Sequence, residues 1–307
     1  MELRKLNHVG KNTLTISLPK SWTIKNNLDK GDQLDIEEQE NRLIIKTINH
    51  EKKEGVIESK NINTFLLNKL ILNAYMKNYN KIIINIENEK IYNNYTNAEV
   101  SIFNYISNII TSYLGMEIIS HGDDKIILQN LFEEGGISNM PIIQKRVVSL
   151  YSEFLERLCG RLSSSKNFSN YNINKDVSNI RKFIYYNMRL IVNSEKSRFS
   201  KIKLYVLYDH LDNSLYGVEK LIKLLARKQR INKKISKLIK EIFNIFISFL
   251  NMEEDMEIFV LNKFIKNRED LLKRIFKEKL SLEENKIIRE IEIFLNLHHD
   301  FILARLQ

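Results

Sequence analysis

The 307-residue sequence has few of the residues that interrupt regular structure. It contains two prolines and nine glycines, so we expect long helices and little irregular structure. Its single cysteine, Cys159, excludes an internal disulfide and a cysteine-rich metal cluster. No apolar run reaches the ~18 residues that a membrane-spanning helix needs, and charged residues interrupt the N-terminus where a signal peptide would lie. We therefore expect a cytoplasmic protein without membrane insertion.

Signatures of common enzyme classes are also absent from the sequence. It has no Walker loop, no Gly-x-Gly-x-x-Gly, no Ser-His-Asp order and no His-Glu-x-x-His. The sequence therefore predicts that the protein is not an enzyme.

Positive charge is abundant and unevenly distributed. The chain carries 48 basic and 38 acidic residues, a net charge of +10, which favours a polyanionic partner such as nucleic acid. Residues 1–30 have six basic and two acidic side chains, whereas residues 31–50 have two basic and five acidic ones. Residues 219–240 have nine basic side chains and one acidic side chain. This last run is either a solvated helix face or a second contact with a polyanion or an acidic protein.

The first 47 residues read as a small strand–helix–strand–strand module. Leu14, Ile16 and Leu18 alternate with polar residues, which predicts a half-buried strand. Ser21 can cap a short helix, and Gly31 can take a positive φ in the turn at residues 28–32. Two further short strands follow. A module of this size is too small to fold well alone, so the sequence predicts an intertwined dimer that binds a ligand or partner.

The rest of the chain divides into a polar linker, an α/β region and a helical region. The α/β region is predicted to contain helices at 62–78 and 97–114 and strands at 81–86, 116–120 and 125–129. Apolar stripes at helical spacing then continue to the end of the chain. They predict two sets of three helices: 141–163, 173–194, 199–228, 231–251, 254–279 and 282–306. The predicted domains are residues 1–48, 60–136 and 140–307, separated by a linker at 49–60.

Several motifs together resemble a known family. The run Ile16-Ser17-Leu18-Pro19-Lys20-Ser21-Trp22, the preceding Gly10-Lys11 and the turn Leu28-Asp29-Lys30-Gly31-Asp32 resemble the AbrB/SpoVT/MazE DNA-binding domain. The Leu-Pro-Lys-x-Trp form is similar to that of PhoU-type phosphate-uptake regulators that carry this domain, mostly in archaea. Asn73-Ala74-Tyr75 and Leu114-Gly115-Met116-Glu117 also resemble those regulators, and the six C-terminal helices match the PhoU double three-helix bundle in number and order.

The resemblance implies a multidomain α+β protein that forms a homodimer through residues 1–48. In that family two chains interleave strands into one swapped-hairpin barrel that binds double-stranded DNA. Phosphate contacts from basic side chains would supply most of the affinity. Side chains that could read groove edges are Arg4, Asn7 and Asn12. The basic residues that correspond in position to the family's DNA contacts are Arg4, Lys5, Lys11, Lys20 and Lys25.

The acidic metal motifs of PhoU bundles are incomplete in this sequence. Asp212 lies where the motif of the third helix would fall, but Tyr216 replaces the second acid. Asp300 lies correspondingly in the sixth helix, with Asn296 in the place of its partner. A multinuclear cluster is therefore not expected, although Asp300 with His298 or His299 could hold one divalent ion such as zinc. Asp212, His299 and Asp300 are thus the candidate ligands, and no other cofactor is expected.

The leading hypothesis from the sequence is a DNA-binding transcriptional regulator of phosphate uptake or phosphate signalling. The alternative is an interaction protein that does not bind DNA. In that case the N-terminal module would only dimerise, and the bundle would regulate a phosphate transporter or sensor protein. A third possibility is a metal-dependent sensor.

Overall fold

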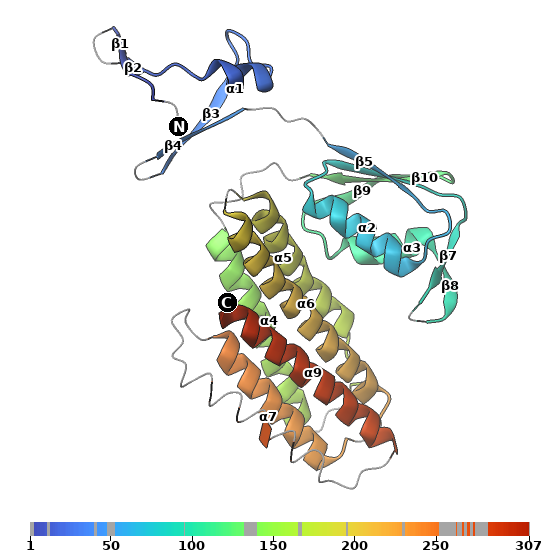
Figure 1. The fold of residues 1–307 in the computed structure, drawn as a ribbon. Helices are drawn as coiled ribbons and strands as arrows, with labels where there is room; N and C mark the ends of the chain where they lie inside the picture. The colour runs from blue at the N-terminus through green and yellow to red at the C-terminus, as the bar shows by residue number, and fades with distance from the viewer. Residues whose placement is uncertain are drawn as a thin grey trace. The chain divides into compact units, whose positions relative to one another are not determined.

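The computed structural model shows two compact units, Met1–Lys52 (unit 1) and Lys53–Gln307 (unit 2) (Figure 1). In unit 1 the structure describes residues 3–10, 13–39 and 42–47. In unit 2 it describes residues 53–94, 96–131, 140–164, 168–194, 196–228, 231–251, 262, 266, 269–270, 273 and 282–306.

Unit 1 contains two separate hairpins and one short helix. Strands β1 (Asn7–Val9) and β2 (Thr13–Thr15) pair antiparallel, as do β3 (Leu34–Gln39) and β4 (Arg42–Thr47). Each hairpin forms its own two-stranded sheet. Helix α1 (Lys20–Lys25) joins them, and Gly31 has a φ of 104°, as the sequence predicts.

The start of α1 corrects one prediction. Pro19, rather than Ser21, occupies the N-cap position, and no side chain caps the helix. Pro19 has a ψ of 128°, the extended conformation that is typical of an N-cap residue, and the helix begins directly after it. Lys20 is therefore the first residue of the helix.

Unit 2 begins with a four-stranded sheet in the order β5-β6-β10-β9. Strand β5 (Glu54–Glu58) runs parallel to β6 (Lys81–Asn85), and helix α2 (Thr64–Met76) connects them. The antiparallel strands β9 (Met116–His121) and β10 (Lys125–Asn130) complete the sheet. The predicted helix at 62–78 and strands at 81–86, 116–120 and 125–129 are thus confirmed, with ends that differ by a few residues.

Two parts of this region differ from the prediction. Strand β5 lies in the segment that we predicted to be a linker. Residues 97–101 do not begin a helix, because β7 (Lys90–Asn93) and β8 (Ala98–Ser101) form a hairpin. Helix α3 (Ile102–Ile110) starts only after it, where the Ser101 hydroxyl accepts a hydrogen bond from the Asn104 amide at 3.4 Å. The local capping interaction therefore sets the helix start.

The C-terminal part of unit 2 is helical. Helices α4 (Met140–Ser163), α5 (Ile173–Asn193), α6 (Arg198–Ala226), α7 (Lys233–Leu250) and α9 (Leu282–Leu306) lie close to predicted helices. The predicted helix at 254–279 falls almost wholly outside the described residues. Helix α6 packs between α5 and α9, while α4 contacts α5 and α7 (Figure 1). None of the described helices has the length and apolarity needed to cross a bilayer.

Polar contacts join the α/β part of unit 2 to helix α5. The Arg189 guanidinium lies 4.7 Å from the centre of the Tyr75 ring and also hydrogen-bonds to Asn78. The Asn193 amide donates to the Met76 carbonyl at 2.9 Å. The Thr111 and Ser178 hydroxyls are 2.8 Å apart. The buried apolar residues of the sheet, of α2 and of the bundle form one continuous core.

Candidate functional site

The described basic residues predicted to bind DNA are all exposed in unit 1. Arg4 and Lys5 precede β1, whereas Lys20 and Lys25 are the first and last residues of α1. Asn7, also exposed, begins β1 and pairs with Thr15, whose hydroxyl donates to the Asn7 carbonyl at 3.3 Å. Lys11 and Asn12 lie outside the described residues. Exposed lysine and arginine side chains can contact the phosphates of DNA without a cost of burying charge.

The turn at residues 28–32 separates the basic half of unit 1 from the acidic half. The Asp32 carboxylate accepts a hydrogen bond from the Asp29 amide at 2.7 Å, and the Asp32 amide donates to the Asp29 carbonyl at 3.2 Å. These bonds and the positive φ of Gly31 fix the reversal before β3. The local structure therefore reverses the chain between the basic segment at residues 4–25 and the acidic strand β3.

Unit 1 has no buried core among its described residues. Every described side chain in it is exposed or half-buried, including Trp22. The β3–β4 pairing brings Ile36 opposite Ile45 and places Leu43 on the same face, yet Ile36 and Leu43 are strongly exposed. Leu14 and Ile16 are likewise exposed, so the half-buried strand that we predicted is uncovered in the single chain. The described residues of unit 1 thus present apolar side chains that are not covered within the unit.

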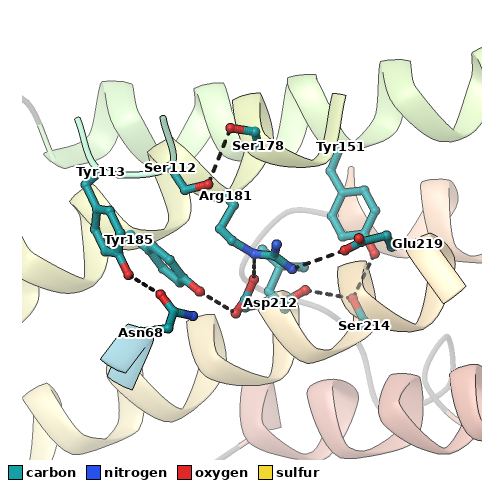
Figure 2. A network of polar contacts seen from close by, with 11 residues as sticks. Asn68, Ser112, Tyr113, Tyr151, Ser178, Arg181, Tyr185, Asp212, Ser214 and Glu219 are labelled. Atoms are coloured by element: carbon teal, nitrogen blue, oxygen red, sulfur yellow. Dashed lines mark hydrogen bonds and ion pairs between the residues drawn. The ribbon is translucent and has the colours of Figure 1, made fainter. Parts of the chain in front are cut away.

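In unit 2, Asp212 belongs to a charge network (Figure 2). The Arg181 guanidinium of α5 contacts the Asp212 carboxylate of α6 at 2.7 Å and the Glu219 carboxylate at 3.7 Å. The Tyr185 hydroxyl donates to Asp212 at 3.1 Å. Glu219 also pairs with Lys223 one turn further along α6.

The structure adds two contacts at Asp212, whose role as a metal ligand stays a prediction. Its carboxylate accepts hydrogen bonds from the Arg181 guanidinium at 2.7 Å and from the Tyr185 hydroxyl at 3.1 Å. No group of three or more potential ligands that could hold a metal ion occurs in the part of the chain that the structure describes. The side chains of His299 and Asp300 lie outside that part.

Burial and neighbouring charges together shift the pKa values of the groups in this network. Burial lowers the pKa of Arg181, but the negative charges of Asp212 and Glu219 outweigh it, and the pKa is raised above its ordinary value. Burial, reinforced by the charge of Asp212, raises the pKa of Tyr185 well above 10. Arg181 is therefore positively charged and Tyr185 neutral throughout the physiological range.

The network continues into the α/β part of unit 2. The Tyr113 ring stacks on Tyr185 with centroids 5.5 Å apart, and its hydroxyl donates to Asn68 of α2 at 2.7 Å. Burial raises the pKa of Tyr113 above its ordinary value. The Ser112 and Ser178 hydroxyls are 3.3 Å apart, and Tyr151 bonds to Ser214 at 3.0 Å (Figure 2). Side chains from α2, α4, α5 and α6 are thus held in a fixed arrangement around the arginine.

A cavity of about 360 Å³ lies beside the network, between α2, α5 and α6. Lys69 and Lys77 line it from α2, whereas Asp209 and Asp212 line it from α6. Charges of opposite sign therefore face the same space. Sequence reasoning did not find this site or the pairing of Arg181 with Glu219. The available signal was the spacing of Asp212 and Glu219, which are seven residues apart and so lie on one face of α6.

One comparison with known proteins returned a match. Residues 8–53 match the model of a family described as antidote-toxin recognition MazE, bacterial antitoxin. The N-terminal part of the chain is therefore similar to an AbrB/MazE-type domain. The matched residues include Lys11, Lys20 and Lys25, the turn at 28–32, and both hairpins of unit 1 except Asn7. Neither the curated proteins nor the solved structures gave a match.

Proposed function

We propose that this chain is a dimeric DNA-binding regulator whose unit 1 binds double-stranded DNA. The observation that carries the proposal is the overlap of the AbrB/MazE-type match at residues 8–53 with the basic segment at residues 4–25, of whose basic side chains only Arg4 and Lys5 precede the match. Arg4, Lys5, Lys20 and Lys25 are exposed there, as contact with phosphates requires. Lys11, Asn7 and Asn12 complete the proposed interface.

We further propose that two copies of unit 1 interleave as a swapped-hairpin dimer. Two separate hairpins with exposed apolar faces leave unpaired strand edges, and such edges are normally covered or paired. A second copy supplies both an apolar surface and strand edges of the same length. The dimer would present the basic segments of both chains to one duplex.

Unit 2 would receive the signal that controls DNA binding. Phosphate status is the signal that the resemblance to PhoU-type regulators implies, either directly or through a transporter or sensor protein. The cavity beside Arg181 could hold a small molecule, since three helices from two parts of unit 2 meet there. Lys69 and Lys77 favour an anion, whereas Asp209 and Asp212 oppose one, so the phosphate link rests on the resemblance alone.

DNA binding can be tested on the full chain with a mixed-sequence duplex and fluorescence anisotropy at several salt concentrations. Lys11→Ala with Lys20→Ala should weaken binding about 100-fold at low salt. It should also reduce the slope of log K against log salt concentration by about 0.9 for each phosphate that the protein no longer neutralises. Lys145→Ala with Lys175→Ala removes two exposed lysines of the bundle and should leave both the affinity and the slope unchanged. Full affinity of the first double variant at low salt would exclude the proposed interface.

A second candidate function is recognition of a protein by unit 1. The description of the matched family names toxin recognition, and the exposed apolar residues of unit 1 could contact a protein instead of a second copy. In that case the interaction protein without DNA affinity becomes the better description. A dimeric full chain with no measurable affinity for any duplex at low salt would favour this candidate.

A further inference from the structure

One face of the four-stranded sheet in unit 2 is uncovered. Ile57, Ile82, Ile84, Ile126 and Leu128 point to the opposite face, where they are buried under α2 and α3 (Figure 1). On the uncovered face, strand pairing aligns Val56 with Ile83 and Ile83 with Ile127. Val56 is 61% exposed, and the other two are half-buried. An apolar row thus crosses three strands without cover from the described residues.

Polar rows border this apolar row on both sides. On one side Glu54, Lys81 and Gln129 are aligned, and Lys81 contacts Glu54 at 3.3 Å. On the other side Glu58, Asn85 and Lys125 are aligned. Asn85 donates to Glu58 at 2.7 Å. The Lys125 ammonium has no hydrogen bond or ion pair with any residue that the structure describes.

We propose that a second copy of this chain covers this face, sheet against sheet, about a two-fold axis parallel to β6. This axis brings β5 of one copy over β10 of the other, because it reverses the strand order while it keeps each row in register. Val56 then meets Ile127 of the second copy, and Ile83 meets Ile83 of the second copy. Glu58 faces Lys125 of the second copy, and the same pair recurs on the other side of the axis. The outer charges of this row are therefore complementary. Lys81 meets Lys81 of the second copy, but each is already paired with Glu54 of its own chain at 3.3 Å.

The size of the face indicates why the contact needs a tether. Three strands about 4.8 Å apart and five residues at about 3.3 Å each cover about 240 Å² per copy. A stable interface buries about 800 Å² on each partner. The face is therefore too small to hold two free molecules together.

The proposed dimer of unit 1 supplies that tether, so this inference rests on the proposed function. Residues 48–53 lie between the end of β4 and the start of β5, and this length spans at most about 25 Å. Two sheets held so close to one dimer have an effective concentration on the order of millimolar. The tether also favours a second copy over an unrelated protein as the occupant.

The contact can be tested in the full chain by pulsed electron spin resonance. Asp123→Cys in the exposed β9–β10 turn carries a nitroxide, and Cys159→Ser removes the native thiol. We expect one narrow distance between the two copies. Glu58→Lys alone and Lys125→Glu alone should each abolish the narrow distance, because like charges then face each other at both ends of the apolar row. The double variant Glu58→Lys/Lys125→Glu restores the opposite charges and should restore the narrow distance.

The exposed pair Lys60–Glu87, 2.9 Å apart, provides the matched control. Its reversal, Lys60→Glu with Glu87→Lys, should leave the narrow distance unchanged. A broad distribution in a chain that light scattering shows to be dimeric would overturn this proposal and leave the dimer of unit 1 intact. A narrow distance that survives both single reversals would also overturn it. A monomeric chain would instead contradict the proposed function.

Discussion

Units 1 and 2 differ in where their apolar side chains lie. In unit 2 the sheet, α2 and the helical bundle share one continuous core that includes fully buried residues such as Tyr75, Tyr151 and Phe246. In unit 1 none of the described residues is buried, although apolar residues alternate along its strands as they would in a half-buried sheet. Burial of apolar surface is the main force that stabilises a fold. Unit 2 therefore contains its own source of stability, whereas the described residues of unit 1 form no such core.

The difference between the two units can be tested by placing a charge at equally exposed apolar positions in each of them. Leu43 of unit 1 is 67% exposed in the single chain, and Ile142 of α4 in unit 2 is 66% exposed. Full burial of a leucine side chain contributes about 1.5–3 kcal/mol, and a dimer has two copies of it. Leu43→Asp should therefore raise the dimer dissociation constant at least about 100-fold and abolish DNA binding, whereas Ile142→Asp should change neither.

Sedimentation measures the dissociation, and Trp22 reports on unit 1 because it is the only tryptophan of the chain. The urea concentration at the midpoint of its fluorescence transition should depend on protein concentration. The midpoint of the bundle's unfolding, followed by far-ultraviolet circular dichroism, should not depend on it in the same way. If Leu43→Asp remained dimeric and Ile142→Asp did not, the dimer contact would lie in unit 2.

The elements with strong periodic patterns could be predicted from the sequence. The helix predicted at 173–194 is observed at Ile173–Asn193, because its apolar stripe persists over several turns. Short strands carry no comparable signal. Strand β5, Glu-Gly-Val-Ile-Glu, has only two apolar residues, and its identity depends on pairing with β6. Non-local pairing of this kind cannot be found from a local pattern.

The candidate sites show the same limit. The resemblance to PhoU bundles identifies Asp212 as a candidate metal ligand, but the sequence does not reveal that Arg181 on another helix contacts it at 2.7 Å. The tertiary contact gives Asp212 an ion-pair partner, and its role as a metal ligand stays a prediction. The DNA-binding residues were assigned by resemblance, and the structure adds the exposure of Arg4, Lys5, Lys20 and Lys25. Their contact with DNA remains a prediction.

The core of unit 2 can be probed through two arginine–aspartate pairs with the same contact distance. Arg181–Asp212 and Arg157–Asp176 are both 2.7 Å long, but the Arg181 side chain is 20% exposed and that of Arg157 is 52% exposed. Arg181→Met leaves Asp212 and Glu219 without a cation in a largely buried site, which should cost about 3–5 kcal/mol of unfolding free energy. Arg157→Met should cost about 1 kcal/mol or less, because the Arg157 side chain is exposed and Asp176 keeps the hydrogen bond from the Tyr171 hydroxyl at 2.6 Å.

Urea denaturation followed by circular dichroism gives both values. Arg181→Lys should retain part of the stability, since a lysine ammonium can neutralise Asp212 but lacks the fork that reaches Glu219 at the same time. Equal losses for Arg181→Met and Arg157→Met would show that the network contributes no more than a surface pair.

A smaller effect is expected at the edge of the unit 2 core, where β5 begins. A Cβ atom at Gly55 would lie 2.4 Å from the Tyr79 ring, whereas one at Gly160 in α4 would meet no atom within 4 Å. Gly55→Ala should therefore cost about 1–3 kcal/mol, because the half-buried ring must move. Gly160→Ala should instead stabilise the helix by about 0.5–1 kcal/mol. Hydrogen exchange of the β5 amides measures the local loss of stability in Gly55→Ala. Unchanged exchange in Gly55→Ala would mean that the ring does not pack on this strand.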